Sequence, residues 1–226
     1  MVILLTADIE RFKEIEEVHW EYYLELEKDM LSTRRYVDFD KANTSTFSLE
    51  YLKLLQAVCS EIDIVGKIIA KELNPDFRPD DRKNSILKWW YEIQDWYDSI
   101  DEKTVLFCRR IEIEPWRQFR VEKYRNKRNA IGYRIANRSC NNTPTWWTSY
   151  NSVKHCRTIR NKRGDMNYVK ANLGNLSKAF AGLYVLEKNY LYGLGDKKNI
   201  ARLEKSRLFD LRKTTEIKVG MQVLVP

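Results

Sequence analysis

The segment 48–73 constrains the fold more than any other stretch of the chain. Ser48 can cap its first turn, and Asn74 and Pro75 end its pattern. Its apolar residues recur every three or four positions, which places them on one face of a helix: Leu52, Leu55, Cys59, Ile62, Val65, Ile69 and Leu73. The spacing predicts a long amphipathic helix that needs a second element against which to bury this face.

Four further segments show helical periodicity: 7–31, 85–100, 144–160 and 167–192. Glycine and proline, which are frequent in turn-rich sheet proteins, number only 8 and 5 in a chain of 226 residues. These features predict a mainly α-helical single domain over 1–226, built as a bundle of antiparallel neighbouring helices.

Residues 104–142 interrupt the helical pattern. The stretch 104–113 is rich in β-branched and apolar residues and predicts a strand. We therefore expect 104–142 to form a basic insertion between helices, either irregular or folded as a β-ribbon. A second, short strand is predicted near the C-terminus, where apolar residues alternate over 217–225.

Positive charge is concentrated in one part of the chain. Residues 117–163 contain thirteen Lys or Arg and one acid, a net charge of +12, whereas the other residues have 27 basic and 31 acidic side chains, a net charge of −4. This asymmetry is typical of proteins that bind a polyanion, and the aromatic residues among the cations favour a nucleic acid, whose bases stack on rings. A solvated basic loop is the alternative. The predicted nucleic-acid-binding residues are Arg117, Arg120, Lys123, Arg125, Lys127, Arg128, Arg134 and Arg160, and the aromatic residues are Trp116, Phe119, Tyr124 and Tyr133.

The helix predicted over 144–160 carries one of only two histidines in the chain. Helical spacing places His155 on one line with Asn151, with Lys154 at its shoulder and Arg157 on the adjacent face. An imidazole exchanges protons near neutral pH, and cations can hold a phosphate. These four side chains are the candidate catalytic residues.

Two other ionisable residues lie within apolar patterns. His19 falls in the apolar stripe of the 7–31 helix, and we expect a core or interfacial histidine with one ring nitrogen satisfied. Small residues flank Asp63 on the 48–73 helix and predict close helix packing that partly encloses this possible supporting acid. An ordinary surface pair between Asp63 and Lys67, four residues later, is an equal alternative.

Four widely spaced cysteines form no Cys-x-x-Cys pair, so neither a zinc site nor a disulfide framework is predicted. Cys156 and His155 are neighbours in sequence and point in different directions on a helix, which disfavours a thiol nucleophile. No segment approaches the roughly 20 apolar residues of a membrane span. We expect a cytoplasmic protein without a metal, a cofactor or a membrane partner.

Residues Asn151 to His155 form a motif of a polar residue, three residues and a histidine, followed by a further predicted helix. Together with the order of helices, this motif resembles the HEPN superfamily of helical domains that act on RNA. The pair Asp63 and Lys67 is similar to an acidic-x-x-x-basic pair of some members. The string Trp-Trp-x-x-Tyr-Asn-x-x-Lys-His-x-Arg also resembles a group of uncharacterised bacterial and mobile-element proteins. The resemblance covers 48–192 without the insertion.

The resemblance implies an RNA-acting protein and a metal-independent endoribonuclease of bacterial defence or toxin systems. In one respect the chain departs from the family's ribonuclease motif, which has an arginine just before the polar residue. Tyr150 occupies that place here, and Arg157 is the nearest arginine that can stand in for it. Members without this arginine can bind RNA or a partner without cutting.

Metal-free RNA cleavage needs a deprotonated 2′-hydroxyl, a protonated leaving oxygen and a stabilised phosphate charge. One chain offers one histidine on the 144–160 helix, so either one imidazole does both proton transfers or a homodimer brings two such helices together. The alternative is a noncatalytic nucleic-acid-binding or partner-binding module, an immunity or scaffold factor. In that case Asn151 and His155 would only satisfy buried polar atoms between helices.

Overall fold

The computed structural model describes residues 8–96, 100–136 and 143–211. The helices are α1 (Ile9–Ile15), α2 (Glu21–Thr33), α3 (Leu49–Leu73), α4 (Ile86–Ile93), α5 (Thr145–Cys156), α6 (Leu173–Leu194) and α7 (Lys197–Arg202). A π-helical turn (Glu16–Trp20) joins α1 to α2, and 3-10 turns occupy Lys41–Asn43, Ile100–Glu102 and Asn167–Lys170. The strands are β1 (Val105–Phe107), β2 (Ile111–Ile113), β3 (Val121–Arg125), β4 (Ile131–Ile135) and β5 (Phe209–Leu211).

The long helices begin at capping side chains. Ser48 Oγ accepts a hydrogen bond from the Tyr51 amide at 3.1 Å, so the predicted start of α3 is confirmed. Asn172 caps α6 in the same way. Because Asn172 supplies this cap and 167–170 forms a 3-10 turn, α6 begins six residues later than its periodicity predicts.

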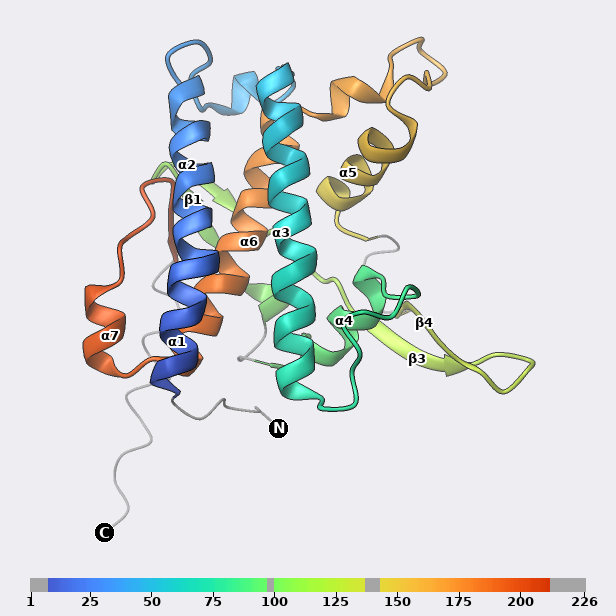
Figure 1. Ribbon diagram of the computed structural model, residues 1–226. Helices are drawn as coiled ribbons and strands as arrows, with labels where there is room; N and C mark the ends of the chain where they lie inside the picture. The colour runs from blue at the N-terminus through green and yellow to red at the C-terminus, as the bar shows by residue number, and fades with distance from the viewer. Residues whose placement is uncertain (1–7, 97–99, 137–142, 212–226) are drawn as a thin grey trace.

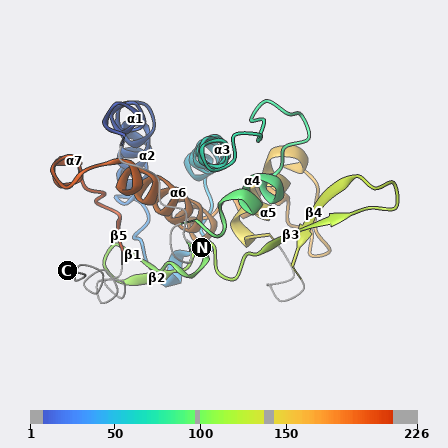
Figure 2. The same ribbon diagram turned by 90° about the horizontal axis from the view of Figure 1, so that it is seen from below.

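The prediction of antiparallel neighbours is wrong for the central pair of helices. The α6 helix lies in the middle of the molecule, and α3 packs beside it in the same direction (Figures 1 and 2). The Leu173 amide at the start of α6 donates to Thr46 O, just before α3, at 2.9 Å. At the far end of both helices, Tyr190 hydrogen-bonds to Glu72. The α1–α2 rod and α5 run the other way (Figure 1).

The prediction of a mainly α, HEPN-like helical bundle is wrong. Of the described residues, 55% are helical and 12% are strand, and two small antiparallel sheets complete the fold. One sheet has the order β2–β1–β5, in which Val105 pairs with Ile113 and Leu211. The other is the two-stranded ribbon β3–β4 within the predicted insertion. The molecule is a mixed helix-and-sheet protein.

The three-stranded sheet belongs to the core. The Phe209 ring of β5 lies 5.3 Å from the Phe107 ring of β1 and 5.7 Å from the Tyr184 ring of α6, measured between ring centroids. A buried carboxylate, Glu27 of α2, fixes the approach to β5 by accepting the Arg207 amide at 2.7 Å. The strand predicted at 217–225 lies outside the described residues.

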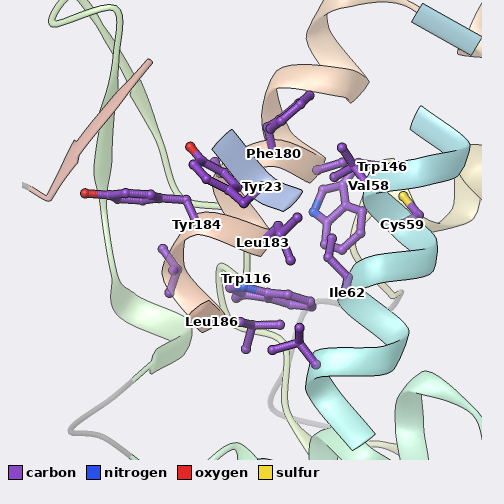
Figure 3. Packing of buried hydrophobic residues seen from close by; sticks show 14 of the residues in the cluster. Tyr23, Val58, Cys59, Ile62, Trp116, Trp146, Phe180, Leu183, Tyr184 and Leu186 are labelled. Carbon is purple, nitrogen blue, oxygen red and sulfur yellow. The ribbon is translucent and has the colours of Figure 1, made fainter. Parts of the chain in front are cut away.

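The first part of the predicted insertion is also core. Trp116 is fully buried between α3 and α6, and its indole donates to Gly182 O at 3.2 Å (Figure 3). Phe119 is fully buried as well. Neither residue can stack on a nucleic-acid base, which corrects that part of the prediction.

Candidate nucleic-acid interface

The β3–β4 ribbon projects from the side of the molecule that carries α4 and α5, away from α1, α2 and α7 (Figures 1 and 2). Asn126 closes its tip, because the Asn126 side chain accepts the Arg128 and Ala130 amides at 2.9 and 3.0 Å. Asn129 adopts a left-handed conformation that asparagine tolerates. This turn exposes the side chains of Lys127 and Arg128.

The base of the ribbon is fixed on α4 and the following turn. Gln94 donates to Val121 O and accepts the Val121 amide, both at 2.9 Å. Arg120 forms ion pairs with Asp95 at 2.7 Å and with Asp101 at 2.8 Å. Arg120 therefore helps to orient the ribbon, and its predicted nucleic-acid contact stays a prediction.

Other predicted contact residues divide into two groups. Arg117, Lys123 and Arg134 have acidic partners: Glu114 at 3.3 Å, Glu92 at 3.5 Å and Glu122 at 2.7 Å, respectively. In contrast, Lys127 and Arg128 have no ion-pair partner among the residues that the structure describes. Their charge is uncompensated, so the excess positive potential of the ribbon lies at its tip.

Tyr124 supplies an aromatic face on the same ribbon. Its ring lies against Gly132, where a β-carbon would come within 2.7 Å of the ring. The Arg134 guanidinium lies 5.4 Å from the Tyr124 ring centroid, a cation–π distance. The Tyr124 side chain is 39% exposed, unlike those of Trp116 and Phe119, which are fully buried.

A second basic loop follows α5 at residues 157–165, at the opposite end of that helix from the ribbon (Figure 1). Asn161 builds the loop, because its side chain accepts the Arg163 and Asp165 amides at 2.8 and 3.0 Å. Arg160 donates to Gly164 O at 2.5 Å. Arg157, Lys162 and Arg163 are exposed, without an acidic partner in the described part of the chain.

Between these two basic elements lies a pocket of about 440 Å³. The α3 helix contributes Ser60 and Asp63, and the start of α4 contributes Asn84, Ser85, Ile86 and Leu87. The remaining lining residues come from α5 and the residue before Pro144: Thr143, Trp147, Tyr150, Asn151 and Lys154. Three predicted site residues, Asp63, Asn151 and Lys154, therefore meet in one cavity although Asp63 and Asn151 lie 88 positions apart in the sequence.

Asp63 is both paired with Lys67 and partly enclosed by a neighbouring helix, the two environments predicted as alternatives from the sequence. Lys67 donates to its Oδ2 at 2.5 Å, which is the surface-type pair, while 32% of the Asp63 side chain remains exposed. The Trp89 indole of α4 donates to Oδ1 at 3.0 Å. Gly66 makes this contact possible, because a β-carbon there would lie 2.7 Å from the Trp89 ring. The carboxylate is thus oriented from both sides at the edge of the pocket.

The polar groups that α5 brings to the pocket have no hydrogen-bond partner among the residues that the structure describes. The indoles of Trp20, Trp89, Trp90, Trp116 and Trp146 each donate to a protein oxygen. Within the described residues, the Trp147 indole, the Tyr150 hydroxyl and the Asn151 amide have no hydrogen-bond partner. The Lys154 ammonium lies 5.3 Å from the Tyr150 ring centroid. This side of the pocket can offer donors and acceptors to a ligand.

His155 and Arg157 do not line the pocket. His155 directly follows Lys154, one turn beyond Asn151, and its side chain is exposed. No described residue hydrogen-bonds to its imidazole, so the alternative that His155 satisfies a buried polar atom between helices is wrong. Arg157 forms the C-terminal cap position of α5 and is exposed as well.

The other histidine is structural, as predicted. His19 lies in the π-helical turn, and its Nδ1 is 2.5 Å from Glu61 of α3. Glu187 of α6 is fully buried nearby, and neither of its carboxylate oxygens has a partner within the described chain. Burial, and then the charge of Glu61, raises the pKa of Glu187 well above its ordinary value.

Sequence reasoning missed several lining residues. Asn84 lies in a charged linker without periodicity, so no pattern pointed to it, whereas Trp147 shares the helical line of Asn151. No family model, curated protein or solved structure matches the chain. The described residues contain no group of three or more His, Cys, Asp or Glu able to hold a metal ion, and none of their helices is long and apolar enough to cross a membrane.

Proposed function

We propose that the protein binds single-stranded RNA along the face formed by the β3–β4 ribbon, the α3–α5 pocket and loop 157–165. The observation that carries this proposal is the position of the uncompensated cations. Lys127 and Arg128 lie at one end of the face, and Arg157, Lys162 and Arg163 lie at the other. A strand that contacts both ends passes the pocket between them. Tyr124 adds a surface for base stacking.

Charge reversal tests this proposal. In Arg125→Glu, Lys127→Glu and Arg128→Glu combined, affinity for a fluorescent RNA 20-mer should fall at least about 30-fold at low salt, because each lost phosphate contact also loses counterion release. Raising the salt from 50 to 200 mM should weaken wild-type binding by about 10² to 10³-fold and weaken binding by the variant less.

The matched control reverses Lys13, Lys28 and Lys198, exposed lysines of α1, α2 and α7 on the other side of the molecule. Its net charge equals that of the ribbon variant. Equal loss of affinity in both variants would mean that overall charge, not this face, attracts RNA. Absence of wild-type binding at low salt would overturn the proposal.

A second candidate function is metal-independent RNA cleavage at the same face, and the meeting of Asp63, Asn151 and Lys154 in one pocket favours it. Exposed His155 directly follows Lys154, which lines this pocket. Since one protomer provides one such imidazole, this function includes the proposal of a homodimer joined near α5. The likeness of residues 151–155 to the HEPN motif supports the same proposal. Tyr150 occupies the place of the motif's arginine, and Arg157 at the end of α5 would stand in for it. This second proposal, RNA cleavage, includes a role in bacterial defence.

A further inference from the structure

The α3–α5 pocket has the size and chemistry of a site for one nucleotide. Its volume of about 440 Å³ lies within the usual range for small-molecule sites. Ile86 and Leu87 contribute apolar surface, and Trp147 and Tyr150 contribute aromatic surface. Polar groups come from Asp63, from α5, and from Ser60, Asn84, Ser85 and Thr143. A cavity whose lining combines aromatic, apolar and polar side chains suits a flat ring with polar edges.

Asp63 decides which ring fits. A carboxylate has about four acceptor positions, and Lys67 and Trp89 occupy one on each oxygen. One acceptor position on each oxygen therefore has no protein donor among the described residues. Such a pair accepts two adjacent N–H donors on one edge of a base.

Guanine alone among the four RNA bases carries two adjacent donors, N1–H and the 2-amino group, beside an acceptor, O6. The nearby donors for O6 are the Lys154 ammonium and the Asn151 amide, both unpartnered in the described chain apart from the Tyr150 ring beneath Lys154. Adenine and cytosine would turn a ring-nitrogen lone pair toward the carboxylate, which is repulsive. Uracil has a single N–H donor. Reading of an unstacked base by its Watson–Crick edge is the common mode of single-stranded RNA recognition.

We propose that the α3–α5 pocket binds one unstacked guanine of a single-stranded RNA, with Asp63 accepting from its N1–H and 2-amino groups. This inference rests on the proposed RNA-binding function and adds a sequence preference to it. Lys154 and Asn151 would then bind O6, while the basic ribbon and loop 157–165 hold the flanking phosphates.

The test measures binding of the full chain to four fluorescent RNA 12-mers: all uridine, and uridine with one central guanosine, inosine or adenosine. The guanosine 12-mer should bind about tenfold more tightly than the uridine 12-mer, the discrimination expected of a two-hydrogen-bond contact. Inosine, which lacks the 2-amino group, should recover only part of this advantage, and adenosine none.

Asp63→Asn should remove the guanosine advantage and leave affinity for the uridine 12-mer within about twofold of wild type. Lys67→Ala is the matched control, because it removes the ion pair and keeps the carboxylate, so the advantage should persist. Melting temperatures identify any variant that fails to fold. Asn151→Ala, which removes an amide without a protein partner in the described chain, should lower the advantage without loss of stability.

Equal wild-type affinity for the guanosine and uridine 12-mers would overturn the guanine site and leave RNA binding intact. Absence of binding to every 12-mer at low salt would overturn both proposals. Free GMP should compete at least about 100-fold less well than the guanosine 12-mer, because it lacks the phosphates that contact the basic elements. If GMP competed as well as the guanosine 12-mer, the ligand of the pocket would be a free nucleotide. That result would contradict the proposal that the pocket binds a guanine within an RNA strand.

Discussion

His155 occupies an exposed position on α5 with no hydrogen-bond partner in the described chain, and this environment allows a clean test of catalysis. Removing a buried, bonded histidine costs roughly 1–3 kcal/mol through the partner left unsatisfied. His155 has no such partner, so His155→Ala should leave the melting temperature and RNA affinity unchanged. If the cleavage candidate is right, the same variant loses cleavage of labelled RNA in the presence of EDTA.

Ser152→Ala, on the same helix, is the control and should cleave as wild type does. Arg157→Ala should slow cleavage with little change in melting temperature. An exposed arginine that holds the phosphate contributes to the rate of cleavage and not to the stability of the fold. Wild-type protein that binds RNA and leaves it uncut after prolonged incubation would eliminate the catalytic candidate and retain the binding function.

Lys188 of α6 illustrates the cost of a buried charge. It is 7% exposed, and its ammonium lies 5.2 Å from the Trp20 ring centroid and 4.8 Å from that of Tyr192. Burial, and then repulsion from Lys205, lowers the pKa of Lys188 to about 8. Between pH 8 and the ordinary pKa of 10.5, the unfolded chain holds a proton that the folded chain has lost. The contribution of Lys188 to the free energy of unfolding therefore rises with pH between these two values.

Lys188→Met should raise the free energy of unfolding at pH 7 by about 2 kcal/mol, because no charge is then desolvated. The gain should shrink as the pH of urea denaturation experiments increases from 7 to 9.5. Lys178→Met, an exposed position on the same helix, should change little at either pH. A destabilised Lys188→Met protein at pH 7 would show that the cation–π contacts outweigh desolvation.

At the scale of elements, the contact of α3 with α4 depends on Gly66. Alanine in place of a helical glycine gains about 1 kcal/mol of helix propensity. Here the new β-carbon would lie 2.7 Å from the rigid, fully buried Trp89 ring, and overpacking of this kind costs about 1–3 kcal/mol. Gly66→Ala should therefore lower the free energy of unfolding in thermal or urea melts. In a Trp89→Leu background, the same change should be neutral or stabilising.

Individual elements were predictable where local chemistry determines them. The apolar spacing and the Ser48 cap specify α3, and the scarcity of glycine and proline agrees with the long helices. The predicted helix over 85–100 is shorter, because α4 ends at Ile93 and the next residues turn to clamp β3 through Gln94. A hydrogen bond between one side chain, such as that of Gln94, and a distant backbone group gives no periodic pattern in the sequence.

At the scale of the whole molecule, the sequence pattern indicated strand structure in 104–113 and allowed a β-ribbon within 104–142, where β1 to β4 lie. It did not reveal the pairing of β1 with β5 or the parallel α3–α6 pair. A three-residue strand such as β5 is too short for alternation, and its partner β1 lies about 100 positions earlier. The basic segment 117–163 is also not one surface. Its first residues enter the core with Trp116. Among its described cations, one group lies on the ribbon, Lys154 lines the pocket, and Arg157, Arg160, Lys162 and Arg163 lie in loop 157–165.

The central claim is that RNA lies on the face of the ribbon, the pocket and loop 157–165. Ultraviolet cross-linking of the full chain to a uridine-rich RNA, followed by mass spectrometry of the linked peptides, tests it most directly. We expect cross-links within 121–136 and 147–163, with Tyr124 among the linked residues, and loss of those in 121–136 in the ribbon variant. Cross-links confined to α1, α2 or α7, or unchanged in that variant, would contradict the account.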